Sequence, residues 1–501
     1  MFGRKIRLTT MHIPFVLSFL MFTASVVLHL YLGQIFKSVL KWYIVLTPGS
    51  AIYKSWASNS TSLLTSIYIF NLQNEQEVLN GGKPFFEEVG PFRFRKVKFK
   101  WDLSFSSESP PKSLRYSQKN VYLPHESLPL SYNNTREVTT MDIFTGGLVA
   151  RPMDKLNKNL FRNTQLFVTK PPREILWGYS NEVLEKCGGL FWCPDKVSVL
   201  MKENSSETET LEIKTGVDDI NERGRVVEFN GKKKFNAWDN EYANMFNGSE
   251  GAFMGFDLRV GDVKYVFVNG LCRSVVMVAT ELIPHPKYPK LKVLKFEPAE
   301  GEIDPNIYPH STEFCKGKSY EPRCAPKSLV AFSPCIEGNL PIYGSQGHFL
   351  GANRSIRDQF TGINEPDETT DKTVMFVEPL SGITFGAFQV MQLSYYIDNT
   401  NLSVLPFENV GGPFFFPLIR IVNEADISEE TLDTIYRMIY GTQEWLNLGV
   451  HILGAVSLLV FFFTTATIIY LARSHLVVPF KIIQTVTNTS KLAMKAANKQ
   501  H

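Results

Sequence analysis

Six cysteines are the side chains in this 501-residue sequence best suited to covalent or metal chemistry, and all lie in its middle part. Structural zinc sites usually contain cysteine pairs separated by two to four residues, whereas the closest pairs here are separated by five, eight and ten. An even number of cysteines without metal spacing favours disulfides. Of the fifteen connectivities open to six cysteines, pairing of neighbours is the simplest, and it gives Cys187–Cys193, Cys315–Cys324 and Cys272–Cys335.

The patterns of the common catalytic and cofactor sites are absent from the sequence. It has no G-x-S-x-G nucleophile elbow, no H-E-x-x-H zinc helix and neither of the glycine-rich phosphate-binding loops. The nine histidines are scattered, and none is paired at a metal-ligand spacing. We therefore expect a protein that is not an enzyme and that holds no metal or other cofactor.

Residues 90–101, GPFRFRKVKFKW, contain five basic residues interleaved with apolar ones. A net charge of only +3 argues against a dedicated nucleic-acid binder, so a strand is the better explanation. The alternation breaks once, where Lys96 follows Arg95 directly. Because the side-chain period of a strand is two, we expect a β-bulge near Arg95–Lys96 that keeps the apolar side on the core and the basic side in solvent.

Two long uncharged segments, residues 13–33 and 446–472, lie near the ends of the sequence. Each meets the roughly 20 residues needed to cross a bilayer. The first is longer than the apolar core of a cleavable signal peptide, which predicts an uncleaved signal anchor. Since basic residues beside a span mark its cytoplasmic side, we expect a cytoplasmic tail (1–12), a large ectodomain between the spans (34–445) and a basic cytoplasmic tail (473–501).

The glycosylation pattern N-x-S/T agrees with this topology. Six matches fall in the expected ectodomain, namely Asn59, Asn133, Asn204, Asn247, Asn353 and Asn401. A seventh, Asn488, falls in the expected C-terminal tail and should stay unmodified. All six cysteines also fall in the ectodomain, where an oxidising compartment would allow disulfides.

The ectodomain sequence predicts many strands and few helices. Apolar runs rich in Val and Phe, separated by Gly, Pro and Asn, predict strands at residues 260–270, 273–282, 291–298, 383–397 and 414–422. Helices are expected at 141–161, where Pro152 must end or restart the helix, and at 428–447, with Ser428 as its N-cap. One large, mostly antiparallel β ectodomain with helical insertions accounts for this pattern.

Several stretches along the ectodomain resemble the class B scavenger receptor family. In chain order they are GPFRFR (90–95), REILWGY (173–179), FNGKKKFNAW (229–238), NGSEGAF (247–253), CRS (272–274), the C-x8-C of Cys315 and Cys324, PCIEGNLPIY (334–343), HFLGA (348–352) and FVEPLSGITF (376–385). Each is short, but their order and the two-span topology also fit the family. Its members include the fatty-acid translocase, the high-density-lipoprotein receptor, the lysosomal integral membrane protein and the sensory neuron membrane proteins.

The resemblance implies an α+β membrane protein in which two transmembrane helices flank an antiparallel β-barrel-like ectodomain. It also implies a helical bundle at the membrane-distal tip and a hydrophobic tunnel that leads toward the bilayer. Family members bind lipids or lipoproteins and pass lipid to the membrane, so the expected partners are fatty acids, phospholipids, lipoproteins and a protein ligand at the tip, with no nucleic acid. The expected location is the plasma membrane, with the lysosomal or endosomal membrane as the alternative.

The resemblance also assigns particular residues. It implies the disulfides Cys272–Cys335 and Cys315–Cys324, in agreement with neighbour pairing, and leaves Cys187–Cys193 as a bridge particular to this chain. In the family, basic residues of the tip helices attract anionic ligands, and the matching segment here contains Lys155, Lys158 and Arg162. Their spacing would place them on one helix face, for which an ordinary solvated face is the alternative explanation.

Two other functions stay open at this point. One is a sorting receptor that carries a lumenal enzyme to lysosomes or endosomes, as the lysosomal relative does. The other is a ligand-gated channel with two spans, which the β-rich motifs and the low number of cysteines disfavour.

Overall fold

The computed structural model describes residues 2–58, 62–129, 132, 136–149, 164–187, 195–200, 208–299, 314, 324–336, 340–398 and 409–497. Contacts divide the chain into two compact units, one made of both chain ends and one of residues 41–432. The unit of the chain ends comprises Met1–Leu40 and Asp433–His501.

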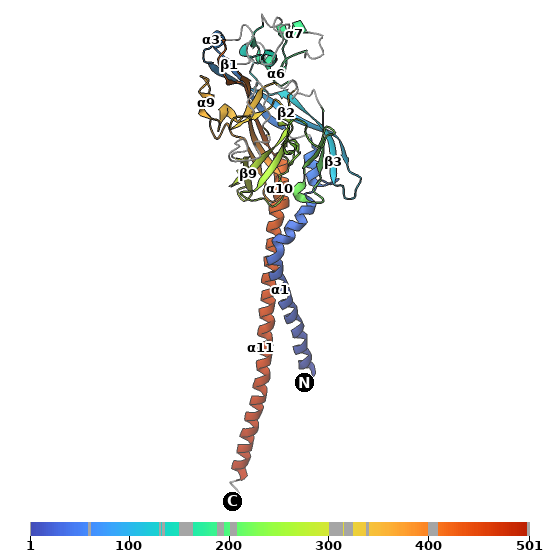
Figure 1. The fold of residues 1–501 in the computed structure, drawn as a ribbon. Coiled ribbons are helices and arrows are strands. Elements are labelled where there is room, and N and C mark those ends of the chain that lie inside the picture. The colour runs from blue at the N-terminus through green and yellow to red at the C-terminus, as the bar shows by residue number, and fades with distance from the viewer. Residues whose placement is uncertain are drawn as a thin grey trace. The chain divides into compact units, whose positions relative to one another are not determined.

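The unit of the chain ends is built on two long helices, α1 (Phe2–Tyr43) and α11 (Thr442–Ala497) (Figure 1). Within the described residues, two segments are long and apolar enough to cross a membrane, Ile13–Tyr43 and Glu429–Tyr470. The predicted spans lie within these helices, which continue beyond the predicted ends. The two-span organisation is therefore confirmed.

Small side chains let the two helices approach each other. The Ser25 hydroxyl donates to the carbonyl of Val450 at 3.1 Å. A Cβ on Gly454 would stand only 2.9 Å from the same hydroxyl oxygen, so a larger residue there would force the Ser25 side chain to move. One turn along, the rings of His29 and His451 lie 5.0 Å apart.

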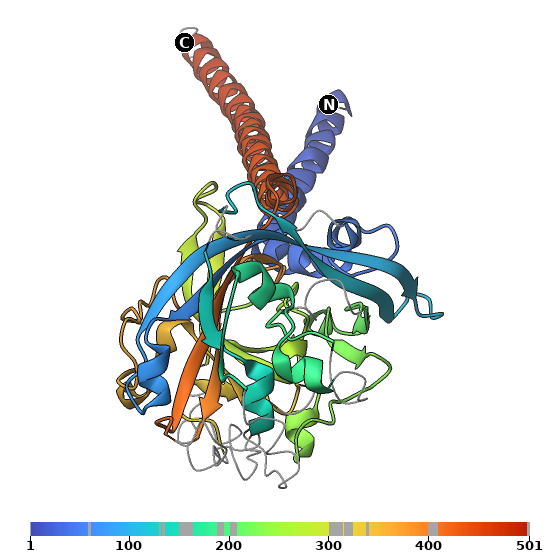
Figure 2. The ribbon, with the colours of Figure 1, turned by 90° about the horizontal axis from the view of Figure 1, so that it is seen from above.

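The second unit is dominated by one 13-stranded antiparallel sheet. Its strands are β1 (Ser62–Leu72), β2 (Phe86–Phe105), β3 (Ser113–Pro124), β6 (Glu209–Lys214), β7 (Val226–Phe229), β8 (Val263–Val268), β9 (Arg273–Pro284), β10 (Lys292–Pro298), β11 (Leu329–Ala331), β12 (Ile342–Ser345), β13 (Val374–Val377), β14 (Thr384–Ile397) and β15 (Phe414–Asp426). The main path runs β7-β6-β3-β2-β1-β15-β14-β13-β10-β9-β8. Figure 2 shows these strands curving around a common interior.

The two edge strands of this path, β7 and β8, approach each other through one short segment. Ser249 forms a bridge to Arg225, next to β7, and a second bridge to Val266 of β8. The amide of Val226 donates to the Gly248 carbonyl, and the amide of Phe267 donates to the Ser249 carbonyl. Backbone bonds therefore nearly close the sheet into a barrel, which leaves little exposed edge.

The remaining elements are short. They are the helices α2 (Ala51–Ala57), α3 (Glu75–Leu79), α4 (Ile143–Val149), α6 (Pro172–Trp177), α7 (Glu182–Cys187), α8 (Glu241–Asn244), α9 (Arg354–Arg357) and α10 (Glu429–Tyr436), and the two-stranded sheet of β4 (Val138–Met141) and β5 (Phe167–Lys170). The five predicted strands correspond to β8, β9, β10, β14 and β15 and are confirmed. The helix predicted from Ser428 begins at Glu429, and the Ser428 hydroxyl accepts from the amide of Thr431 at 3.3 Å.

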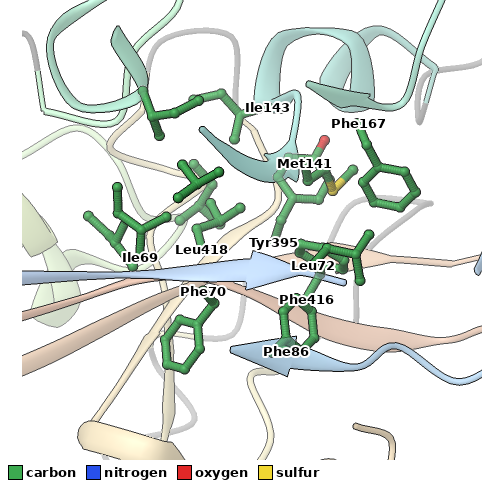
Figure 3. Packing of buried hydrophobic residues seen from close by; sticks show 14 of the residues in the cluster. Ile69, Phe70, Leu72, Phe86, Met141, Ile143, Phe167, Tyr395, Phe416 and Leu418 are labelled. Atoms are coloured by element: carbon green, nitrogen blue, oxygen red, sulfur yellow. The ribbon is translucent and has the colours of Figure 1, made fainter. Parts of the chain in front are cut away.

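The largest hydrophobic cluster joins the sheet to the small β4–β5 sheet and α4. Figure 3 shows Ile69 of β1 and Leu418 of β15 on the same side of the sheet as Met141 and Ile143 of α4, whereas Phe70 points to the other side, toward Phe86. Helix α4 packs so closely that a Cβ on Gly146 would stand 2.5 Å from the Met141 side chain. The predicted helix at 141–161 is thus present as α4 at its start, and residues 150–163 lie outside the described part of the chain.

Candidate functional site

Strand β2 has one side that faces the core, and its side chains change character along the strand. Phe92 and Phe94 belong to the main hydrophobic cluster. Their pairing with β1 continues without a shift from Phe92 to Val97, and the pairing with β3 continues from Phe94 to Trp101. Because residues two apart share a face, Lys96, Lys98 and Lys100 lie on the same side as the two phenylalanines. We call these five residues the β2 core row.

The predicted bulge at Arg95–Lys96 is therefore wrong. The prediction that the basic side faces solvent is wrong for the three lysines, whereas Arg95 is exposed as predicted. The register shifts lie elsewhere, near Gly90–Pro91 and at Asp102. At the first shift, a Cβ on Gly90 would stand 2.7 Å from the Ile67 carbonyl oxygen, so the close approach of β1 and β2 requires glycine. The alternation of apolar and basic residues breaks at Arg95–Lys96 although the strand is continuous. The reason is that the side chains on its core side change from aromatic to cationic.

Lys100 shows how a lysine is accommodated on this side. Its ammonium donates to the Trp56 carbonyl at 2.9 Å and lies 3.7 Å from the centre of the Trp56 ring. The Glu250 carboxylate is 4.0 Å away. The same carboxylate accepts from the Trp56 indole at 2.7 Å and from the Tyr116 hydroxyl at 2.5 Å.

Burial sets the protonation behaviour of this group. It lowers the pKa of Lys100 to about 8, although Glu250 acts in the opposite direction. Burial alone would raise the pKa of Glu250, but Lys100, Lys98 and the two donors outweigh it and hold that pKa below its usual value. The carboxylate is therefore charged at neutral pH and fixes the cationic end of the row.

The other end of the row is aromatic and reaches the short helices. The Lys96 ammonium lies 5.1 Å from the centre of the Tyr122 ring. Tyr122 in turn lies 5.3 Å from Trp177 of α6, and Trp177 makes an edge contact with Phe94 at 5.5 Å. The Trp177 indole donates to the hydroxyl of Tyr132. An ammonium group over an aromatic ring is attracted to the ring, which stabilises a lysine on this side of the sheet.

Two amide side chains of β3 face the middle of the row. Register places Asn120 opposite Lys98 and Gln118 opposite Lys100. Among the described residues, Asn120 Oδ1 and Gln118 Oε1 are buried without a hydrogen-bond donor. A buried acceptor without a donor costs about 1–3 kcal/mol, so the site would be stabilised by a polar group that donates to these oxygens. Lysines, amide oxygens without donors and aromatic rings therefore meet on the core side of β2.

A second polar cluster is buried against the opposite side of the sheet. His348 Nδ1 lies 2.8 Å from Asp371 and its Nε2 lies 3.3 Å from Glu88. Arg420 donates to Glu88 at 2.7 Å and lies 3.6 Å from Asp371. We call these four residues the ion cluster. His348 is held in a left-handed conformation with φ of 47°, and its amide donates to Gln392 at 2.8 Å.

The pKa shifts in the ion cluster agree in direction with its geometry. Burial alone would lower the pKa of His348, but hydrogen bonds to Asp371 and Glu88 raise it above its usual value. Burial would raise the pKa of Glu88 and of Asp371, yet His348 and Arg420 hold both below their usual values. Sequence reasoning missed this cluster because its members are distant in the chain. Only His348 lies in a motif that had been singled out.

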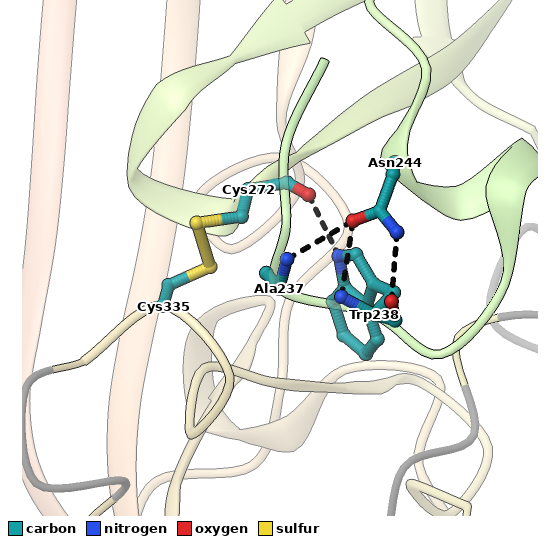
Figure 4. The surroundings of a disulfide bond; sticks show 5 residues. All are labelled: Ala237, Trp238, Asn244, Cys272 and Cys335. Carbon is teal, nitrogen blue, oxygen red and sulfur yellow. Dashed lines mark hydrogen bonds between the residues drawn. A yellow bond between two sulfur atoms is a disulfide. The ribbon is translucent and has the colours of Figure 1, made fainter. Parts of the chain in front are cut away.

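The disulfide between Cys272 and Cys335 is present (Figure 4). Trp238 packs beside it and donates from its indole to the Cys272 carbonyl at 2.7 Å. Asn244 fixes the Trp238 segment by accepting from its amide at 3.0 Å and donating to its carbonyl at 2.7 Å. The motif FNGKKKFNAW therefore supports the bridge, a role that the sequence had not indicated.

The other predicted site residues are only partly described. Cys324 is disulfide-bonded, whereas Cys315, Cys193 and the basic residues Lys155, Lys158 and Arg162 lie outside the described residues. Of the predicted glycosylation sites, Asn59, Asn133, Asn204 and Asn401 also lie outside them.

Two glycosylation sites are described. Asn353 is exposed, and its Oδ1 caps α9 by accepting from Ser355 at 3.0 Å, which leaves the amide nitrogen for a glycan. Asn247 is half-buried beside the segment that closes the sheet. In the described part of the chain, no group of three or more His, Cys, Asp or Glu side chains could hold a metal ion.

Comparison with known proteins identifies the family. The profile described as "CD36 family" matches residues 15–468, which is most of the chain. The chain belongs to the CD36 family. It is 25% identical over 408 residues to lysosome membrane protein 2 of Homo sapiens, covering 80% of this chain and 82% of the relative.

Two further relatives show the breadth of the similarity. Scavenger receptor class B member 1 of Sus scrofa is 24% identical over 450 residues, covering 85% of this chain and 82% of the relative. Sensory neuron membrane protein 1 of Apis mellifera is 24% identical over 468 residues, covering 85% and 86%. The family resemblance seen in the motifs is confirmed. The protein is a class B scavenger receptor-type membrane protein with two spans.

Proposed function

We propose that this protein is a receptor that binds lipids or lipoproteins with its ectodomain and passes lipid to the membrane that it spans. The observation that carries the proposal is the β2 core row, where lysines follow aromatic side chains on the inner side of a nearly closed apolar sheet. Membership of the CD36 family supports it, since one relative is named as a scavenger receptor.

The chemistry of the row fits an amphiphile. Each methylene of an acyl chain gains about 0.8 kcal/mol when it leaves water for an apolar surface, and an interior path would let the chain move without re-entering water. A carboxylate or phosphate on such a molecule needs a cation once it is buried. Lys96 and Lys98 would supply that charge, while Asn120 and Gln118 would accept from a hydroxyl or a protonated head group.

The proposal includes a membrane topology. Basic residues beside both spans favour cytoplasmic tails at residues 1–12 and 473–501, with the ectodomain at 34–445 outside the cell or in a lumen. The six ectodomain sequons would then be open to glycosylation and Asn488 would not. We place the protein in the plasma membrane.

The test is identification of lipids that co-purify with the full chain, combined with transfer of a fluorescent fatty acid from donor vesicles to vesicles that contain the protein. The Lys98→Glu variant should reduce bound anionic lipid and transfer at least fivefold, because it reverses the charge in the middle of the row. The matched control is Arg95→Glu, an exposed residue of the same strand, which should leave both unchanged. A preparation that contains no lipid and transfers none would refute the proposal.

The ion cluster favours a second candidate, a sorting receptor for a lumenal protein in an acidic compartment. A buried histidine between two carboxylates gives most stability when it is protonated, which suits an acidic lumen, and one relative is named as a lysosome membrane protein. Co-purification of a soluble hydrolase at neutral pH that is released at pH 5, without any lipid transfer, would favour this function over the first.

A further inference from the structure

Both connections between the β unit and the spans lie at one end of the sheet. After α1, the segment at Ile44 is held by Arg223, whose guanidinium donates to the Ile44 carbonyl and to the Ser381 carbonyl, each at 2.5 Å. Before α10, the amide of Ile427 donates to the Phe385 carbonyl at 2.6 Å. The turn from 378 to 386 therefore contacts both segments through which the β unit is joined to the spans.

A tight turn at the same end presents apolar side chains to solvent. The amide of Met254 donates to the Gly382 carbonyl at 2.8 Å, and the segment that follows leads into a turn from Arg259 to Asp262. Val260 stands at the tip of this turn and is 55% exposed, and Val263 is 53% exposed. Turn tips normally carry polar residues or glycine, so a valine there requires an explanation.

Basic and apolar side chains of the β9–β10 hairpin extend this surface. The amide of Gly261 donates to the Ala279 carbonyl at 2.8 Å, which holds the turn against β9. Leu282 of β9 is 46% exposed. Lys287 and Lys290 are exposed in the hairpin loop, and Lys287 lies 3.2 Å from Glu429 at the start of α10. We call Arg259, Val260, Val263, Leu282, Lys287 and Lys290 the base patch.

The beginning of the β unit also contacts the turn segment. The ammonium of Lys41, three residues before Ile44 at the end of α1, lies 5.1 Å from the centre of the Phe256 ring. The turn segment therefore contacts the chain at the end of α1, the helix that contains the first span.

We propose that the base patch docks on the bilayer that the chain itself spans, with Val260 and Val263 entering the interface and the cations contacting lipid phosphates. Exposed apolar residues rimmed by basic ones are typical of membrane-interface binding. Because the chain is tethered beside this bilayer, the effective lipid concentration is high and weak contacts suffice. A membrane is favoured over a protein partner because both segments that join the β unit to the spans leave it at the end of the sheet that carries the base patch. The proposal does not depend on lipid transfer through the β unit.

The experiment uses the full chain in nanodiscs with an environment-sensitive fluorophore on one introduced cysteine. In the variant Val260→Cys, nitroxides at carbon 5 of phosphatidylcholine should reduce the fluorescence at least twofold. The matched control is Phe85→Cys, which labels another exposed apolar residue. Phe85 precedes β2 where Phe86 pairs with Leu72 at the opposite end of β1 from the membrane connections, and its label should not be quenched. The unsubstituted chain measures background labelling.

A second set of variants tests the cations without changing the apolar tip. Reversing Arg259, Lys287 and Lys290 to Glu should at least halve the quenching at position 260 in nanodiscs that contain phosphatidylglycerol. Equal quenching at 260 and 85 would overturn the proposal. So would quenching at 260 only by a water-soluble nitroxide, or protection of position 260 only in native membranes, which would indicate a protein partner.

Discussion

Replacement of His348 by glutamine tests whether the ion cluster stabilises the protein as its geometry implies. The residue is 5% exposed, and its imidazole bonds to both Asp371 and Glu88. Removing one member of a buried ionic group typically costs about 3–5 kcal/mol. We expect about 3 kcal/mol at pH 5.5, at the lower end, because Arg420 still faces both carboxylates.

The expected loss depends on pH. The pKa of His348 is raised in the folded protein, so its contribution is fully present below its ordinary value of 6.5 and is lost as pH rises through the folded pKa. The pKa values of Glu88 and Asp371 are lowered, so their contribution is present above their ordinary values and is lost as pH falls through the folded ones. The cluster therefore stabilises most between about pH 4.5 and 6.5.

The assay is denaturant unfolding of the full chain at pH 5.5 and pH 8, followed by tryptophan fluorescence. The difference between wild type and His348→Gln should be larger at pH 5.5. The matched control is His125→Gln, because the imidazole of His125 bonds to its neighbour Ser127 in an exposed hydrogen bond. A loss below 1 kcal/mol at pH 5.5, or an equal loss at both pH values, would refute the argument.

Three further perturbations address other parts of the structure. Glu250→Ala removes the carboxylate beside the buried Lys100 and should destabilise the protein by about 3 kcal/mol in denaturant unfolding, whereas loss below 1 kcal/mol would show that the pair contributes little. The double variant Cys272→Ala/Cys335→Ala opens a disulfide of sequence separation 63 and should cost about 4 kcal/mol by the chain-entropy estimate. An unchanged unfolding midpoint would contradict that role. Reversal of Lys155, Lys158 and Arg162 to Glu should lower binding to anionic vesicles at least threefold by flotation, and unchanged binding by correctly delivered protein would favour the solvated-face explanation.

The local sequence pattern was sufficient to predict those elements whose formation depends on neighbouring residues. Apolar length located both spans, and Val- and Phe-rich runs located β8, β9, β10, β14 and β15, because strand and span formation depend on side chains a few residues apart. Ser428 was identified as an N-cap because its hydroxyl bonds an amide three residues away. The order of short motifs was sufficient to assign the family.

Tertiary structure decided everything that depends on which strands are neighbours. The sequence pattern predicted that Lys96, Lys98 and Lys100 face solvent, because basic residues that alternate along a strand usually lie on its exposed side. The structure places them on the core side, since Glu250 and Trp56, which are remote in sequence, stabilise Lys100. The ion cluster likewise combines residues 88, 348, 371 and 420. Such groups cannot be recognised from spacing, because their compensation exists only after the sheet has brought distant segments together.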